Sequence, residues 1–586
     1  MSLRTLALFC FFLSGATGLF YQVLWTRLLG STIGNTHFSI TVVVSVFMGG
    51  LAFGSFLGGR VADRSRNPLR LYGILNLVGA LLCIAVPPAS TLGEPLFRWV
   101  YQSYDGHPEA TPLLILRIVF SALLILGPTI CMGATLPALA RYLTTKMSDV
   151  GFTVGRLYSV NTFGAVFGVF LAGFWAMEHL GLWGTTTLAV VIDVIIGALV
   201  IWVSRTETQE PSPEPEQTSD AANSAPAASL PGYVKLAVFA FFATGFGNMV
   251  LEIAWTKAIV QTIGNSTYAF SLIVTLFILG IGLGGGIMTL VVDRLKNLNL
   301  ALGVVSSLTA LCIAATVPIL GRFPIWGARY FDAVEQPNYD TFLWIKIWMV
   351  AIAILPSTTL MGCVFPIVGK IRTRAIEKVG SAIGTAYFAN TLGAILGTLS
   401  AGFLFIPVFG KVYYTIYLGA GISLAVGLLL ILTASEVSTK RRGSLAAGLA
   451  AIVLIPHAFL LPHGVLGSTS SLWDPAILSK GAYVYYKGTY YLNRRTKEVV
   501  PVETLIEETR AGNEVLWYRE GIHAPVVVVK NPTKGLAMRI SGKVEASIPA
   551  EGGYNRDLPH QVMAGHLPMI LHPDPKEVLT LGLGGG

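Results

Sequence analysis

The most constraining feature of this chain is a long stretch that occurs twice without a gap. Residues 11–64 begin with FFLSGATGLFYQVLWTRLLGSTIGN and end with GSFLGGRVADR. Residues 241–294 begin with FFATGFGNMVLEIAWTKAIVQTIGN and end with GGGIMTLVVDR, so the second copy lies 230 positions after the first. A further stretch repeats at an offset of 229, where Tyr158 recurs as Tyr387. Repeats of this length are too long for a solenoid unit and indicate a duplicated domain of about two hundred residues.

The composition identifies the kind of domain that is duplicated. Of the 586 residues 53% are hydrophobic and only 12% are charged, and the mean hydropathy is +0.66. Because soluble chains carry about 25% charged residues, we predict a polytopic membrane protein whose main partner is the lipid bilayer. The net charge of +9 then indicates basic loops at one membrane face and not nucleic-acid binding. The five cysteines have neither pairing nor metal-ligand spacing, so we expect no metal site.

Each half contains six apolar runs that are long enough to cross a bilayer. They are 5–26, 37–59, 69–88, 112–140, 154–176 and 182–203 in the first half, and 235–256, 266–292, 299–320, 342–369, 382–406 and 412–433 in the second. An even number of helices lets both halves enter the membrane in the same sense. We therefore predict a mainly α-helical fold of two parallel six-helix repeats.

The chain divides into five parts on these grounds. They are the first repeat (1–205), a flexible linker rich in Pro, Glu and Ser (206–231), the second repeat (232–436), a thirteenth apolar segment with its connection (437–471), and a C-terminal domain (472–586). Basic residues gather after the even-numbered helices, so we predict a multi-pass protein of the inner (plasma) membrane with a cytoplasmic N-terminus and linker.

The side of the C-terminal domain is less simple to predict. Lys440, Arg441 and Arg442 place the start of the thirteenth segment in the cytoplasm, and a spanning segment would put the domain outside. Pro456 interrupts the run, however, and basic residues follow it. We therefore predict a re-entrant or interfacial thirteenth segment and a cytoplasmic C-terminal domain.

Two acidic residues fall within the apolar runs and are candidates for a polar site in the membrane. Glu252 replaces Gln22 of the first copy, and Asp193 has no acidic counterpart in the second. Ionisable residues at membrane depth commonly serve transport, and these acids would suit a polycation. The structural alternative is that Glu252 pairs with Lys257 or caps a broken helix.

The C-terminal part has a different character. Residues 472–550 are polar and strand-like, with a hairpin turn at 531–535, and a helix follows before a proline-rich exit. The apolar run 576–581 leads into Gly582, Gly584 and Gly586. A strand followed by G-x-G-x-G is typical of the start of a nucleotide-binding Rossmann-like domain. We expect the rest of such a domain to follow Gly586, so that this chain holds a truncated one.

Two resemblances add to this interpretation. The pattern GRVADR at 59–64 resembles the loop between helices 2 and 3 of major facilitator superfamily transporters. The segments EGIHAPV at 520–526, SGKVEAS at 541–547 and HLPMILHPDPK at 566–576 resemble the fused membrane-domain/spermidine synthase family. That family joins a polytopic domain to a domain similar to polyamine aminopropyltransferases.

The second resemblance implies an enzyme that transfers an aminopropyl group from decarboxylated S-adenosylmethionine to an amine such as putrescine. The adenosyl donor would be a co-substrate, and no tightly bound cofactor is implied. Gln561 and the glycines Gly582, Gly584 and Gly586 would lie near the donor, and His560 and His566 near the amine. The catalytic residues would lie beyond Gly586, so we expect this chain alone to be inactive.

One departure from that family leaves other functions open. The run Pro559-His560-Gln561 stands where soluble spermidine synthases have Tyr-His-Glu, which puts the acceptor amine in doubt. The alternative is a polyamine or small-cation transporter with a nucleotide-binding or non-catalytic appendage, and a third is a methyltransferase on the same scaffold. The two histidines also suit a helix surface without any function. The sequence leaves the acceptor amine and the oligomeric state open.

Overall fold

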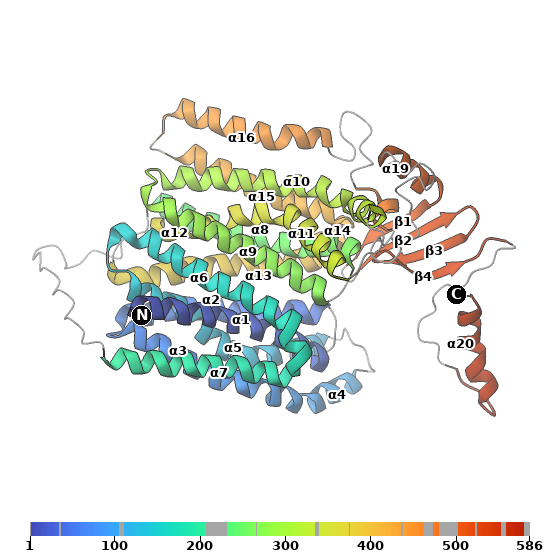
Figure 1. Ribbon diagram of the computed structural model, residues 1–586, viewed down its shortest axis with the longest axis horizontal. Coiled ribbons are helices and arrows are strands. Elements are labelled where there is room, and N and C mark those ends of the chain that lie inside the picture. Colours follow the sequence, from blue (N-terminus) through green and yellow to red (C-terminus); the bar gives the residue numbers. More distant parts are fainter. Residues whose placement is uncertain are drawn as a thin grey trace, which may run out of the picture.

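The computed structural model describes residues 2–33, 37–104, 111–206, 231–264, 267–333, 339–373, 376–434, 437–460, 473–479, 502–521, 524–551 and 558–578. It is a bundle of long, roughly parallel and antiparallel helices with a small sheet at one end (Figure 1). Most of the predicted linker 206–231 lies outside the described residues.

The helices of the bundle follow the predicted apolar runs. The first half contains α1 (Leu3–Ile33), α2 (His37–Arg64), α3 (Pro68–Leu92), α4 (Glu94–Ser103), α5 (Thr111–Leu143), α6 (Val150–Leu171) and α7 (Met177–Thr206). The second half contains α8 (Gly232–Ile263), α9 (Thr267–Val291), α10 (Leu298–Ala333), α11 (Tyr339–Gly362), α12 (Val364–Arg372), α13 (Val379–Ser400), α14 (Ile406–Phe409) and α15 (Val412–Thr433). The short helix α4, which the sequence did not predict, connects α3 to α5.

The duplication is visible in the backbone as well as in the sequence. A π-helical turn follows α6 at Ala172–Ala176 and follows α13 at Ala401–Phe405. Shortly after each turn, a glycine has a positive φ, which is +65° at Gly181 and +64° at Gly410. Glycine adopts this conformation without the steric cost that a Cβ would cause, so the chain can break its helix there. The same break at the same place in both halves confirms the repeat.

Eleven segments of the described chain are long and apolar enough to cross a membrane. One of them, Met147–Arg205, is 59 residues long, which is about 88 Å of continuous helix and far more than a bilayer requires. The break at Gly181 divides it, so that α6 and α7 form separate crossings. The protein is therefore a mainly helical, polytopic membrane protein, as predicted.

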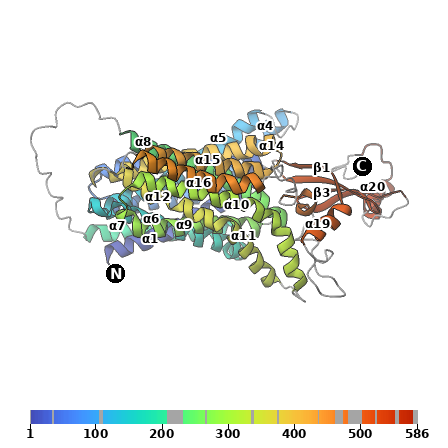
Figure 2. The ribbon, with the colours of Figure 1, turned by 90° about the horizontal axis from the view of Figure 1, so that it is seen from above.

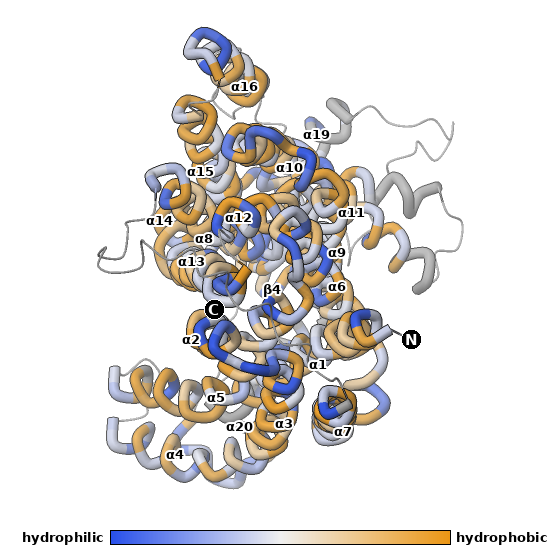
Figure 3. Tube along the Cα trace, turned by 90° about the vertical axis from the view of Figure 1, so that its left-hand side faces the viewer, coloured by the Kyte–Doolittle hydropathy of each residue, from blue (hydrophilic) through white to orange (hydrophobic). Residues whose placement is uncertain are grey.

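The two halves meet along two helix pairs, α2 with α13 and α6 with α9. Figure 3 looks along the helices and shows the second half, with α8 to α15, above the first half, with α1 to α7. Most of the buried apolar side chains lie in three clusters: one spans both halves, one belongs to the second half, and one belongs to the first half. The interface between the halves is thus part of the main core.

Helix α16 (Thr439–Leu460) forms the thirteenth apolar segment. It packs against α10 and α15 at the edge of the bundle (Figures 1 and 3). Ala446 and Leu449 contact Ile431, whereas Val453, farther along α16, contacts Leu424, so α16 runs antiparallel to α15. Its 22 residues extend over about 33 Å without turning back. The helix therefore does not turn back as a re-entrant segment would, and it is not among the eleven segments that are apolar enough to cross a membrane.

The C-terminal region forms an antiparallel sheet with the strand order β1-β2-β3-β4. Its strands are β1 (Glu514–Glu520), β2 (Pro525–Asn531), β3 (Gly535–Ile540) and β4 (Lys543–Ile548). The helices α17 (Pro475–Leu478) and α19 (Val502–Ala511) contact β1, and α20 (Leu558–Leu571) follows the sheet in the chain. The hairpin turn forms as predicted, because the Asn531 side chain accepts hydrogen bonds from the backbone N–H groups of Thr533 and Lys534. Within the described residues no Rossmann-like sheet is present, and Gly582, Gly584 and Gly586 lie outside them.

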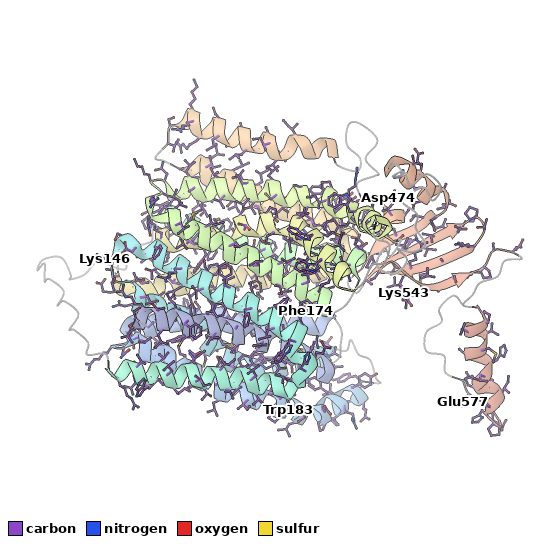
Figure 4. The ribbon with its side chains drawn as sticks, in the orientation of Figure 1. Lys146, Phe174, Trp183, Asp474, Lys543 and Glu577 are labelled. Atoms are coloured by element: carbon purple, nitrogen blue, oxygen red, sulfur yellow. The ribbon has the colours of Figure 1, made fainter. Side chains whose placement is uncertain are left out.

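The sheet lies at the end of the bundle opposite to the linker (Figures 1 and 2). The linker connects the end of α7 to the start of α8, whereas the sheet contacts Lys257 and Gln261 near the end of α8. Figure 4 shows the same separation, with Lys146 at one end of the bundle and Asp474 at the junction with the sheet. Our prediction placed the linker and the C-terminal domain on the same side of the membrane. In the structure α16 carries the chain from one end of the bundle to the other.

Candidate functional site

The repeated asparagines hold the helices of each half together. Asn161 on α6 donates a hydrogen bond from Nδ2 to the carbonyl oxygen of Phe11 on α1, at 3.3 Å. Asn390 on α13 makes the same bond to Phe241 on α8, at 2.9 Å. These residues carry part of the sequence repeat, and their role is helix packing.

Two repeated aspartates join the halves to each other at the linker end. Asp63, at the end of α2, accepts hydrogen bonds at 2.8 Å from the backbone N–H groups of Gly380 and Ser381, at the start of α13. Asp293, after α9, accepts one at 2.8 Å from Phe152, at the start of α6. Each carboxylate thus caps a helix of the other half, where the free N–H groups and the helix dipole favour negative charge. This symmetric pair holds the linker end of the interface closed.

Small residues bring the halves into close contact along the same interface. A Cβ on Gly59 of α2 would lie 2.4 Å from the carbonyl oxygen of Gly380 on α13. A Cβ on Gly285 of α9 would lie 2.9 Å from the hydroxyl oxygen of Ser159 on α6. Glycines therefore set the separation of the helices here, as small residues commonly do between membrane helices.

An aromatic cluster lies where the two halves face each other. Phe365, which is 1% exposed, has its ring centroid 4.5 Å from that of Tyr158 and 6.3 Å from that of Tyr387. Phe241 contacts the same ring at 5.5 Å. Because Tyr158 and Tyr387 occupy the same position in the two repeats, their common neighbour lies near the axis that relates the halves. Neither tyrosine hydroxyl has a hydrogen-bond partner among the described residues, so both can meet a ligand or water.

Glu252 is on the same helix and the same face as Phe241. The two residues are 11 positions apart, which is three turns of helix and about 16 Å. Glu252 is half-buried and, within the described part of the chain, has no hydrogen-bond or ion-pair partner. It does not pair with Lys257, whose Nζ lies 3.4 Å from the carbonyl oxygen of Gly521. Helix α8 thus carries a carboxylate without a counter-ion, three turns nearer the sheet end than the aromatic cluster.

Asp193 has a different environment and belongs to the core of the first half. Its side chain is 5% exposed and accepts hydrogen bonds from the Thr17 hydroxyl at 2.7 Å and the Tyr21 hydroxyl at 2.9 Å. Both donors are on α1, so the acid joins α7 to α1. The structure does not bring Asp193 and Glu252 together, since each is embedded in its own half.

The family model of the Major Facilitator Superfamily matches residues 5–331, which is more than half of the chain. The chain belongs to the Major Facilitator Superfamily. No curated protein matches it. The match covers the first repeat and part of the second, so the similarity to the family lies in the bundle and not in the sheet.

Solved structures of this superfamily resemble the bundle at low sequence identity. They include the transporter FucP in an outward conformation, with 16% identity, a TM-score of 0.47, and coverage of 73% of this chain and 97% of that chain. A bacterial homologue of the iron transporter ferroportin in an outward-facing state has 12% identity, a TM-score of 0.49 and coverage of 74% and 99%. The human organic anion transporter MFSD10 has 12% identity, a TM-score of 0.47 and coverage of 73% and 100%.

Membership in the superfamily corrects our main functional prediction. We predicted a membrane-bound aminopropyltransferase similar to spermidine synthase, but the family match identifies the bundle as a major facilitator domain and gives the spermidine synthase resemblance no support. The finding agrees instead with the alternative, a transporter with an appended domain. The prediction rested on three short segments, at 520–526, 541–547 and 566–576, and all three lie outside the residues that the family model matches.

The residues predicted to bind the adenosyl donor and the amine do not form a site among the described residues. His560 and His566 are exposed on α20, which stands apart from the bundle (Figure 1). Gln561 lies in the same helix, but its side chain is outside the description. The three glycines are outside it as well, so their predicted role has no structural counterpart here.

A buried carboxylate attaches the sheet to this major facilitator bundle. Glu520, at the end of β1, is 1% exposed and accepts hydrogen bonds from the backbone N–H of Val412, the Gln261 amide, the Trp473 indole and the Tyr518 hydroxyl. Burial raises the pKa of Glu520 above its ordinary value. Burial and the adjacent Glu520 carboxylate raise the pKa of Tyr518 well above its ordinary value.

The contacts around Glu520 attach the sheet to the second half of the bundle. The Arg519 guanidinium donates a hydrogen bond to the carbonyl oxygen of Pro407, at 3.2 Å. The backbone N–H of Glu520 donates one to the carbonyl oxygen of Gly410, at 3.0 Å. Trp473 packs against Tyr413 with a centroid distance of 5.7 Å. The sheet is therefore fixed to the second half of the bundle, and it would move with that half.

Proposed function

We propose that this protein is a transporter of small organic cations, such as polyamines, which it moves through the interface between its two halves. The observation that carries the proposal is Glu252, a half-buried carboxylate on a bundle helix with no partner among the described residues. A charge at membrane depth is costly unless it is paired. A cationic substrate would supply the missing counter-charge.

The basic residues of the bundle favour a cation over an anion. Arg117 on α5 and Lys346 on α11 are half-buried counterparts in the two repeats, and each already has an interaction partner. Both lie within two turns of the start of their helices, nearer the sheet end than Glu252. Neither of these two basic residues is therefore a charge without a partner, in contrast to Glu252.

The aromatic cluster suits the same class of ligand. Tyr158 and Tyr387 present rings and free hydroxyls near the axis between the halves. Ammonium groups are attracted to the faces of aromatic rings by roughly 0.5–2 kcal/mol. The substrate would pass from Glu252 toward this cluster while the pairs at Asp63 and Asp293 keep the linker end closed. Breaking those pairs would then open that end.

The appended sheet would lie outside the cell. Basic residues gather at the linker end, among them Arg64, Arg141 and Lys440, and such residues favour the cytoplasm. The sheet is at the opposite end, fixed to the second half. This arrangement supports an external, non-catalytic appendage on a transporter of the inner membrane.

Labelling from two sides tests this orientation. A single cysteine at Ser219 in the linker should stay unlabelled by a membrane-impermeant maleimide in intact cells and react after lysis. A single cysteine at Lys534, which is exposed in the hairpin, should react in intact cells. Both variants need the five native cysteines replaced. Labelling of both positions from the same side would contradict the arrangement.

Uptake into proteoliposomes tests the proposed activity. We expect vesicles that contain the purified full chain to take up labelled spermidine or putrescine at least about tenfold faster than empty vesicles. An organic anion of similar size should not compete. If a panel of amines shows no uptake above empty vesicles under either direction of proton or sodium gradient, the proposal of cation transport is wrong.

A further inference from the structure

A polar pocket lies inside the second half of the bundle. It is lined by Ala243, Thr244, Asn248, Ser306, Thr309, Met361, Val364, Ile422, Ser423 and Val426, from α8, α10, α11, α12 and α15. Five of the ten side chains carry a hydroxyl or an amide, and none carries a charge. Such polarity is unusual at this depth of a membrane domain.

The repeat explains why the space exists. Gly73 contacts Gly197 in the first half, and Gly303 contacts Gly427 in the second, so equivalent positions on these helices differ by 230. At that offset, the pocket residues replace the cluster around Asp193. Thr244 replaces Ser14, Gly247 replaces Thr17, Ser306 replaces Asn76 and Ser423 replaces Asp193. The replacement of an acid, a threonine and an asparagine by smaller residues leaves the space open.

Three hydroxyl groups of the pocket present lone pairs and not protons. Thr244 donates its proton to the carbonyl oxygen four residues earlier at 2.8 Å, Ser306 does so at 2.9 Å and Thr309 at 2.8 Å. Since each hydroxyl has only one proton, the oxygen is left as an acceptor. The wall of the pocket is therefore rich in acceptors.

Two further polar groups of the pocket lack partners. The Asn248 amide and the Ser423 hydroxyl make no hydrogen bond to any residue that the structure describes. Polar groups of this kind are usually satisfied by a protein partner, a ligand or water. A ligand that accepts electron pairs from oxygen would satisfy both the Asn248 carbonyl oxygen and the hydroxyl oxygens.

Glu252 adds a negative charge close to these oxygens. It follows Asn248 by four residues on α8, so the two side chains are neighbours on one helix face, with Cβ atoms about 5–6 Å apart. Thr244 lies one turn in the other direction. These three residues form a line of oxygen atoms along one face of α8.

We propose that this pocket binds a monovalent metal cation, with Na⁺ as the ion to test. Neutral oxygen ligands with one nearby carboxylate suit a hard cation of single charge. The inference deepens the proposed function, because a cation bound beside Glu252 would be coupled to the substrate there. The coupling of the ion to transport rests on the proposed function, whereas the binding of the ion can occur without it.

The test is the binding of radiolabelled Na⁺ to the purified full chain in detergent, without any transport. We expect saturable binding of one ion per chain. Asn248→Ala should weaken it at least tenfold, and so should the isosteric pair Thr244→Val with Thr309→Val, which keeps the shape of the pocket. The matched control is Ser14→Ala in the first half, which should leave binding unchanged.

The outcomes separate this inference from the proposed function. Absence of saturable binding would mean that the pocket holds only water and would overturn the proposal. Binding that survives both sets of pocket variants, or that Ser14→Ala removes equally, would place the ion elsewhere and overturn it too. Binding lost only in the pocket variants supports it, even if the chain transports no amine. In that case the proposed function alone is wrong.

Discussion

Replacing Glu252 with Gln is expected to reduce uptake of cationic amines by at least about 30-fold. Gln has nearly the shape of Glu but no charge, so the substrate ammonium would lose its counter-ion in a poorly hydrated site. Removing one partner of a buried charge pair costs about 2–5 kcal/mol, and every 1.4 kcal/mol is a factor of ten. The measurement is the initial rate of spermidine uptake into proteoliposomes that contain equal amounts of folded protein.

Two further variants show whether the effect is specific. Glu252→Asp keeps the charge and should retain part of the uptake. Asp193→Asn removes the other buried acid and weakens its bonds with Thr17 and Tyr21, so we expect a lower melting temperature. Normal uptake by Glu252→Gln, or a variant that merely fails to fold, would assign Glu252 a structural role.

The bundle could be predicted from the sequence because membrane helices leave direct signals. Each apolar run coincides with one helix or with consecutive helical segments, although helices such as α1 and α10 continue well beyond the predicted runs. The 230-residue offset predicted the two halves. The π-helical turns at Ala172–Ala176 and Ala401–Phe405 occur at equivalent positions of the two repeats. Hydropathy and repetition are properties of the chain itself, so no knowledge of packing was needed.

The contacts between the halves could not be predicted, because they depend on how the repeats face each other. Asp63 and Asp293 were recognised as repeated residues, but their partners lie more than a hundred positions away in the other half. The aromatic cluster around Phe365 has the same origin. The repeat contained one signal for the aromatic cluster. Equivalent residues of two copies, such as Tyr158 and Tyr387, can lie close together at the axis that relates the copies.

The C-terminal region was predicted less well for two physical reasons. β4 was not predicted as a separate strand, because it is only six residues long and depends on its pairing with β3. The side of the sheet was predicted from Pro456 and the basic residues after it, whereas α16 continues through Pro456 to Leu460. Helix α16 packs against the bundle with Leu445, Ala446, Leu449 and Val453, whereas its two glycines are exposed.

Joining α6 to α9 by a disulfide is expected to stop transport completely. The pair is Ser159→Cys with Gly285→Cys, in a chain whose five native cysteines are replaced. A Cβ at position 285 would lie 2.9 Å from the Ser159 hydroxyl oxygen, which suits the sulfur position of a disulfide. The two helices belong to different halves, so the bond would prevent the linker end from opening.

The controls for this pair are simple. Oxidation should not change the uptake of either single cysteine variant, because neither can form the bond. The fraction of cross-linked protein can be followed by alkylation of the remaining thiols. Normal transport by the reduced pair shows that the substitutions themselves do no harm.

The most direct test of the account is amine uptake by this pair before oxidation, after oxidation and after reduction. The account predicts uptake in the reduced state, loss of uptake in proportion to the cross-linked fraction, and recovery with a reductant. Full uptake while nearly all of the protein is cross-linked would contradict it, because transport would then not require the halves to separate.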